Sequence, residues 1–131
     1  MKLITISAGN VTMEAELNEG PTARKVWDAL PIEARANTWG DEVYFEIPVS
    51  AVEEPDARAD VAVGELGYWP VGSAFCIFFG PTPVSSGAEP RAYSPVNILG
   101  SVLGDATRFR GVRSGAAVRL ARVEVAADRS G

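Results

Sequence analysis

The fold of this chain is decided by two stretches, NTWGDEVYF at residues 37–45 and GYWPVGSAFCIFFG at residues 67–80. Each stretch places a Gly- or Pro-containing turn between strand-like segments, which is the pattern of a β-hairpin. In the first stretch, Gly40-Asp41 fits a two-residue hairpin loop. In the second, residues 74–79 contain no polar side chain. We therefore expect this strand to be covered on both faces and to form the centre of the core.

The N-terminal residues predict another hairpin. Residues 2–7 form one strand, and Ala8-Gly9-Asn10 supplies the turn because Gly and Asn tolerate a positive φ. From Val11 to Leu17, apolar and polar residues alternate. This period of two is typical of a half-buried antiparallel strand.

One segment has the periodicity of a helix. Pro21 suits a first helical turn, where its missing N–H would be unpaired in any case, and Pro31 ends the helix. The apolar residues that share one face are Ala23, Val26, Trp27 and Leu30. Trp27 is therefore expected to pack in the core rather than to contact a ligand.

The other elements are less regular. Strands are expected at residues 32–38, 42–47, 64–69, 73–79, 95–102 and 116–125, and a short helical turn at 105–112 capped by Asp105. Residues 49–62 are expected to form an acidic surface loop, and residues 81–93 a loop of a length that is often functional. About eight strands and one helix predict a mainly β fold, a closed eight-stranded β-barrel. It would form one domain over residues 1–125, followed by a frayed tail at 126–131.

Composition excludes several classes of partner. The 131-residue chain has a net charge of −5, which disfavours nucleic acid and anionic membranes because both require clustered Lys and Arg. Cys76 is the only cysteine, so an internal disulfide is excluded, and its apolar strand predicts a buried, inert thiol. No stretch has the length of a signal peptide or a membrane helix, and we expect a cytoplasmic protein.

The chain contains no histidine, which removes most of the usual catalytic arrangements. Without histidine and with one cysteine, a structural zinc site is excluded, and we expect neither a metal nor a cofactor. Glu42 is a weak candidate for acid–base catalysis, because burial beside Trp39 and Tyr44 would raise its pKa. The alternative is an ordinary acidic residue at the start of a strand.

Five aromatic residues lie at or beside the ends of the predicted hairpins, near the rim of the barrel. They are Trp39, Tyr44, Tyr68, Trp69 and Phe79. Ligand sites often form at the mouth of a barrel, and Tyr and Trp combine a large apolar face with one polar tip. Packing and ligand contact both remain open for this set. Asn97, inside an apolar strand, either ties a loop in place or faces the ligand pocket.

Several segments together resemble a known family. Besides residues 37–45, they are GYWPVG at 67–72, FFGPTP at 78–83 and SPVNILG at 94–100. In this order they are similar to the small prokaryotic cyclophilin-like proteins of uncharacterised function, and the resemblance covers nearly the whole chain. It implies an eight-stranded barrel capped by helices, which agrees with the strand count.

The resemblance carries activity less well than fold. True cyclophilins are peptidyl-prolyl isomerases, and their site joins an arginine, apolar walls, a glutamine and a histidine. This sequence contains neither glutamine nor histidine. Arg35 and Arg91 flank the distinctive segments, but neither lies in an isomerase-like pattern, and both are weak catalytic candidates.

Three functional hypotheses follow. The favoured one is a binding module for a peptide or small molecule in an aromatic-lined pocket near Trp39, Tyr44 and Trp69. The second is a weak prolyl isomerase. The third, implied by related barrels, is a subunit-like domain of an amide or urea-derivative hydrolase complex. Association into a homo-oligomer or with a partner subunit stays open.

Overall fold

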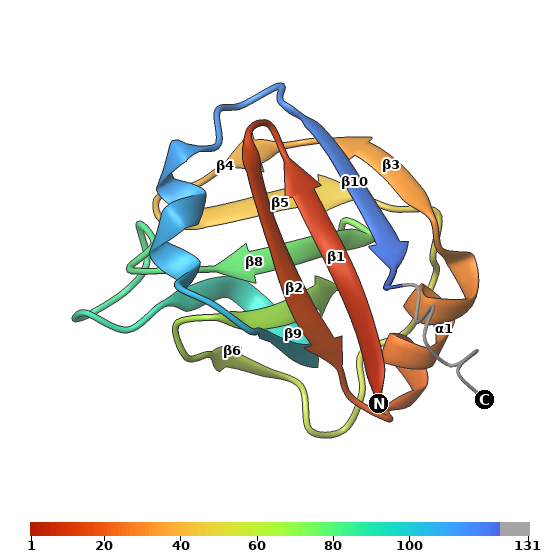
Figure 1. The fold of residues 1–131 in the computed structure, drawn as a ribbon. Coiled ribbons are helices and arrows are strands. Elements are labelled where there is room, and N and C mark those ends of the chain that lie inside the picture. Colours follow the sequence, from red (N-terminus) through yellow and green to blue (C-terminus); the bar gives the residue numbers. More distant parts are fainter. Residues whose placement is uncertain (124–131) are drawn as a thin grey trace.

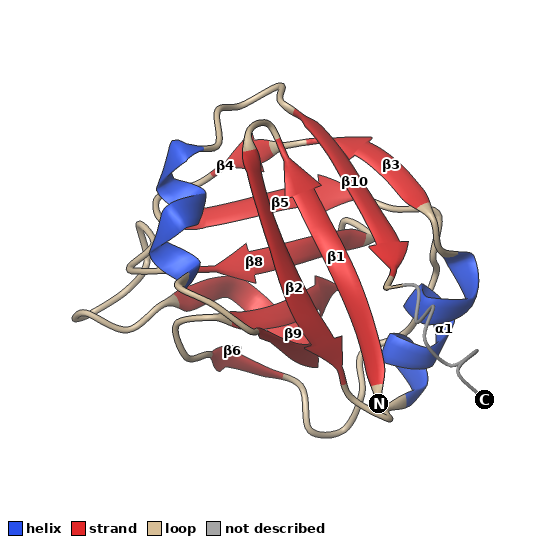
Figure 2. Cartoon of the chain, viewed as in Figure 1, coloured by secondary structure: helices blue, strands red, loops and turns tan. Residues whose placement is uncertain are grey.

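The computed structural model describes residues 1–123 and consists mainly of strands (Figures 1 and 2). The strands are β1 (Lys2–Ala8), β2 (Val11–Leu17), β3 (Ile32–Arg35), β4 (Asn37–Thr38), β5 (Glu42–Glu46), β6 (Arg58–Asp60), β7 (Glu65–Trp69), β8 (Ala74–Phe78), β9 (Arg91–Val102) and β10 (Ala117–Arg122). The helices are α1 (Pro21–Ala29) and the 3-10 helix η1 (Ala106–Gly111). The expectation of a mainly β fold is confirmed.

The strands form one antiparallel sheet in the order β3-β10-β1-β2-β9-β7-β8-β5-β4, and β6 pairs with β9 beside this path. The path has two ends, because no pairing within residues 1–123 joins β3 to β4. The expected closure of the barrel by hydrogen bonds is therefore not formed in this part of the chain. The two end strands are nevertheless neighbours in sequence, separated by Ala36 alone.

The predicted N-terminal hairpin and helix are confirmed. β1 and β2 pair from Lys2 opposite Leu17 to Ala8 opposite Val11. The helix begins at Pro21, and the face that carries Ala23 and Val26 is buried. Trp27 is half-buried against the main core, and the Arg122 guanidinium lies 4.6 Å from its ring centroid.

The helical turn capped by Asp105 is also confirmed. The Asp105 carboxylate accepts a hydrogen bond from the Thr107 backbone N–H at 3.0 Å. Phe109 of this helix is fully buried, and its ring centroid lies 6.4 Å from that of Phe79. The helix therefore covers the core beside the end of β8.

Strands β5, β7 and β8 carry apolar residues on both faces, as their composition requires. The inner face belongs to the main core, here called the inner cluster, which includes Val43, Phe45, Leu66, Phe75 and Ile77. The outer face belongs to a second group, here called the outer cluster, which consists of Val61, Ala74, Cys76, Phe78, Ala92 and Val96. Two layers of apolar side chains therefore share one sheet, and the fully apolar strand at residues 74–79 separates them.

Strand β9 supplies much of the cover of the outer cluster. Its C-terminal half pairs with β2 and β7, whereas the segment before Asn97 pairs with β6. The register shifts at Gly67 of β7, where a Cβ would lie 2.8 Å from a methyl group of Val96. The absent side chain of Gly67 thus lets β9 cross closely over the outer face.

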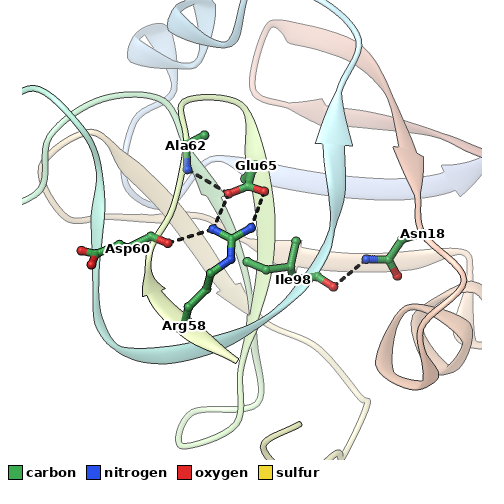
Figure 3. A network of polar contacts seen from close by, with 6 residues as sticks. All are labelled: Asn18, Arg58, Asp60, Ala62, Glu65 and Ile98. Atoms are coloured by element: carbon green, nitrogen blue, oxygen red, sulfur yellow. Dashed lines mark hydrogen bonds and ion pairs between the residues drawn. The ribbon is translucent and has the colours of Figure 1, made fainter. Parts of the chain in front are cut away.

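Strand β6 was not expected, because it lies inside the segment interpreted as an acidic loop. Arg58 holds it against the sheet: its guanidinium donates two hydrogen bonds to the Glu65 carboxylate, at 2.9 and 2.8 Å, and one to the Asp60 carbonyl (Figure 3). Glu65 also accepts the backbone N–H of Ala62. Arg58, a charged residue of the predicted loop, thus pairs with Glu65 of the next strand and helps to fix β6.

Two further boundaries differ from expectation. β9 begins at Arg91, earlier than the predicted start at residue 95, because the pairing with β6 extends it. β10 covers Ala117–Arg122 of the strand predicted at 116–125. The end of that strand and the tail predicted at 126–131 lie outside the described residues. In residues 1–123 no helix combines the length and apolar character needed to cross a membrane.

Candidate functional site

A cavity of about 200 Å³ lies against the outer cluster. Its lining comes from the turn between β4 and β5 and from strands β5, β7, β8 and β9. The lining residues are Trp39, Glu42, Tyr44, Trp69, Cys76, Ala92, Tyr93 and Val96. The cavity therefore opens on the outer face of the sheet and not at a barrel mouth, where the aromatic residues were expected to gather.

The alternation of the strands selects these side chains. Glu42 and Tyr44 are two residues apart on β5 and point to the same face. Tyr44 pairs with Cys76 of β8, so both lie next to each other on that face. The intervening Val43 and the following Phe45 point inward to the inner cluster.

The turn before β5 places Trp39 at the edge of the cavity. The backbone N–H of Trp39 donates to the Glu42 carbonyl at 3.0 Å, which closes the predicted two-residue loop. Gly40 has a φ of +59°, a conformation that favours glycine. A Cβ there would lie 2.8 Å from the Pro83 ring, so the turn packs closely against the following loop.

The Tyr93 ring stands at a steep angle to both indoles that line the cavity. The Tyr93 ring lies 6.1 Å from Trp39 and 6.1 Å from Trp69, at interplanar angles of 72° and 84°. The Trp69 indole N–H donates to the Ser94 hydroxyl at 2.6 Å, which fixes the ring. The ring also lies over Gly72, where a Cβ would be 2.7 Å from it. The Tyr93 ring therefore meets each indole edge to face and stacks on neither.

Glu42 is the one carboxylic acid among the described residues that line the cavity. The residue is 6% exposed, and burial raises the pKa of its carboxyl to about 7, a shift that the neighbouring Cys76 thiol opposes. Burial, together with the adjacent Glu42, raises the pKa of the Cys76 thiol well above its usual value. The thiol is therefore protonated and unreactive, as its apolar strand predicts, whereas Glu42 changes charge near neutral pH.

Four of the predicted site residues come together in this cavity: Trp39, Glu42, Tyr44 and Trp69. The other five lie elsewhere: Tyr68, Phe79, Asn97, Arg35 and Arg91. Tyr68 is fully buried in the inner cluster, and its hydroxyl donates to the Val49 carbonyl at 2.7 Å. Phe79 is likewise in the inner cluster.

Asn97 is fully buried. Of the two roles expected for it, it ties a loop in place and does not face the pocket. Its amide donates to the Val52 carbonyl and the Thr22 hydroxyl, and its carbonyl accepts the Glu54 N–H. These bonds join β9 to helix α1 and to the loop before β6, and they leave the amide outside the cavity lining.

The two candidate arginines do not line the cavity. Arg35, on β3, donates to the Gly115 carbonyl at 3.1 Å and borders a shallow hollow between β3 and β10. Arg91 lies 3.6 Å from the Asp60 carboxylate and borders a second hollow beside the loop at 86–90. Most residues around both hollows are exposed. The lining of the aromatic cavity contains no arginine within residues 1–123.

Sequence reasoning missed Tyr93, the ring that contacts both indoles. It fell within the predicted loop at 81–93, although it belongs to β9. The available signal was its position beside Ser94-Pro95, the start of one of the segments that carry the family resemblance. Ala92 and Val96, which line the same cavity, are apolar, so their sequence did not indicate a site.

The described part of the chain offers no set of side chains that could bind a metal ion. Residues 1–123 contain no group of three or more His, Cys, Asp or Glu side chains arranged to hold a metal ion. The donors that do meet in the cavity are a single carboxyl and a single thiol.

Comparison with known protein families gives one match. The sequence pattern of the cyclophilin-like family matches residues 2–121. The solution structure of the hypothetical protein AF2241 from Archaeoglobus fulgidus is similar over 93% of this chain and 95% of its own, with 36% identity and a TM-score of 0.79. Among curated proteins, no sequence matches. The family pattern spans nearly every strand described above, and the chain therefore belongs to the cyclophilin-like family.

Proposed function

We propose that this protein is a binding module that holds a small molecule, or a side chain of a peptide, in the cavity between Trp39, Tyr44 and Trp69. The observation that supports it is the convergence of four aromatic rings, Tyr93 being the fourth, on one half-open space. Rings used only for packing are normally buried, as Phe45 and Phe75 are in the inner cluster. Tyr93, by contrast, is 72% exposed although it contacts both indoles.

The cavity offers apolar faces with few polar groups, which is the usual make-up of a ligand site. Trp69 contributes its ring alone, because its N–H is already engaged by Ser94. The polar group at the base is Glu42, which is nearly buried and changes charge near neutral pH. The rings would supply contact area and the carboxyl would supply orientation.

Prolyl isomerisation is the weaker alternative. That chemistry requires a guanidinium near the amide nitrogen, and the two candidate arginines are engaged elsewhere, Arg35 with the Gly115 carbonyl and Arg91 with Asp60. A hydrolase subunit is the third option, and it would work with a partner chain. In each case the proposed setting is the cytoplasm. Nucleic acid is not proposed as a partner, because the net charge of −5 opposes binding to phosphates.

The proposal is tested by a fragment titration followed through the indole N–H resonances. The chain has three tryptophans, of which Trp39 and Trp69 line the cavity and Trp27 lies on α1. We expect a saturable shift of the Trp39 and Trp69 signals with a subset of small fragments, while the Trp27 signal stays in place. Trp39→Ala should abolish the response at Trp69 without unfolding the protein. A mixed panel of charged and neutral fragments that moves neither signal would refute the proposal.

A further inference from the structure

The electrostatic character of the cavity selects among ligands. Its lining combines four aromatic rings with one carboxyl, and among residues 1–123 it includes no Lys or Arg. The face of an aromatic ring carries negative charge density, so a ring attracts a cation placed over it. The ring faces and the Glu42 carboxylate therefore both favour positive charge, and the lining offers an anionic ligand no cationic side chain within residues 1–123.

Within residues 1–123, no Lys or Arg forms an ion pair with Glu42. The one described group that favours its ionised form is the Cys76 thiol. Arg110 lies 3.4 Å from the carboxylate of Asp41, which precedes Glu42, and Arg91, which precedes Ala92, lies 3.6 Å from the carboxylate of Asp60. The other titratable groups that line the cavity are the Tyr44 and Tyr93 phenols. A buried carboxylate without a partner is costly, so a counter-ion brought by the ligand would be strongly favoured.

The shape points to a compact group. Ligand pockets for drug-sized molecules usually measure about 300–1,000 Å³, and this cavity measures about 200 Å³. The Tyr93 ring stands at 72° to Trp39 and at 84° to Trp69, so Tyr93 and the indoles bound the space in different directions. A rounded group, such as an alkylated nitrogen, presents a similar surface in each of these directions.

Resting on the function proposed above, we infer that the cavity binds an organic ammonium ion. Its alkylated nitrogen would lie against the faces of Trp39, Trp69 and Tyr93, with the Glu42 carboxylate as counter-ion. The remainder of the ligand would extend through the opening beside Tyr93. Both a free alkylammonium compound and an alkylated lysine side chain present this chemistry.

The decisive probe is choline beside its neutral isostere, 3,3-dimethylbutan-1-ol, which replaces the charged nitrogen by carbon at nearly the same shape. Binding is followed by the indole resonances of Trp39 and Trp69 at about pH 8.5, where Glu42 is ionised because its pKa is about 7. We expect choline to bind at least about ten-fold more tightly than the alcohol, the ratio that ring faces and a desolvated counter-ion supply together. A third arm with a short peptide containing trimethyl-lysine separates the two sources of the ammonium group.

Glu42→Gln provides the matched control, since it keeps the size of the side chain and removes its charge. In this variant the affinity for choline should fall about ten-fold, while that for the alcohol stays within about three-fold. Lowering the pH to about 5.5 should weaken choline binding in the wild type and leave the variant unchanged, because protonation of Glu42 removes the same charge.

The outcomes separate this inference from the function on which it rests. If the alcohol binds as tightly as choline, or if Glu42→Gln leaves the ratio of the two unchanged, the ammonium assignment is wrong while the binding module stands. If neither probe, nor any member of the fragment panel, shifts Trp39 or Trp69, both are wrong. Preference for the trimethyl-lysine peptide over choline would support the assignment and identify a peptide as the source.

Discussion

The inner and outer faces of strands β5, β7 and β8 differ in how tightly their side chains are packed, although alternating residues of the same strands form both faces. On the inner face, the rings of Phe45 and Phe75 stack 5.2 Å apart at 17°, and both are fully buried. On the outer face, the half-buried Tyr44 and Trp69 lie beside a carboxyl and a thiol. The inner face is packed for stability, whereas the outer face keeps apolar surface available.

The difference shows how a strand can serve two purposes at once. Because successive side chains point to opposite faces, Val43 can complete the core while its neighbours Glu42 and Tyr44 form the cavity. A polar or ionisable residue on the inner face would have no water within reach. An ionisable residue on the outer face borders a half-open cavity, and Glu42 lies there.

The sharpest way to test this comparison is to truncate one ring on each face. Phe75→Ala should lower the free energy of unfolding by about 3–5 kcal/mol, because it leaves a cavity in a sealed core. Trp69→Ala should cost about 1–2 kcal/mol, because that ring is half-buried and already borders open space. Chemical denaturation measures both, and Val71→Ala, at a residue that is 77% exposed, serves as the neutral reference. Equal losses for the two rings would contradict the distinction between the faces.

A second test uses the pH dependence of stability. The pKa of Glu42 is about 7 in the folded protein, compared with an ordinary value of 4.5. Between these values the folded state binds more protons than the unfolded state, so stability falls as the pH rises through this range. Glu42→Gln removes the titration and should stabilise the protein by up to about 3 kcal/mol above pH 7, with no gain below about pH 4.5.

Glu46→Gln is the matched control for this experiment, since it removes the same charge from an exposed position on the same strand. Its stability should follow the wild-type pH dependence. Denaturation curves recorded at several pH values distinguish the two variants. A Glu42→Gln protein whose stability parallels the wild type across this range would show that the carboxyl is not desolvated.

A smaller effect is expected at the turn between β7 and β8. Gly72→Ala places a methyl group where the Trp69 indole now lies, 2.7 Å away, so the ring must move. We expect a loss of about 1–2 kcal/mol, and a changed Trp69 indole resonance. Gly87→Ala is the control, because a Cβ at that loop position has open space around it. An unchanged indole signal in Gly72→Ala would mean that the turn does not position the cavity wall.

The sequence predicted the elements whose signals are local. The alternation in β2, the proline at the start of α1 and the Asp105 cap each act within a few residues, and each prediction is confirmed. Strand β6 was missed because its evidence is long-range. Arg58 and Asp60 are exposed, and their side-chain partners, Glu65 for Arg58 and Arg91 for Asp60, come later in the chain, as does the strand β9.

The candidate site was predicted in part for the same reason. Trp39, Tyr44 and Trp69 stood out as aromatic residues near turns, but proximity to a turn does not specify a face of the sheet. Tyr68 precedes Trp69 directly and points to the opposite side, into the inner cluster. The alternation of side chains along a strand could have assigned Tyr68 and Trp69 to opposite faces. The position of Tyr93 in the cavity lining depends on how β9 crosses the sheet, which no local pattern specifies.

The short end strands of the sheet have a consequence for solubility. β3 has four residues and β4 has two, and a single residue connects them. Exposed strand edges are templates on which other chains add by backbone pairing, and their danger grows with length. These two edges therefore offer few backbone groups on which another chain could add.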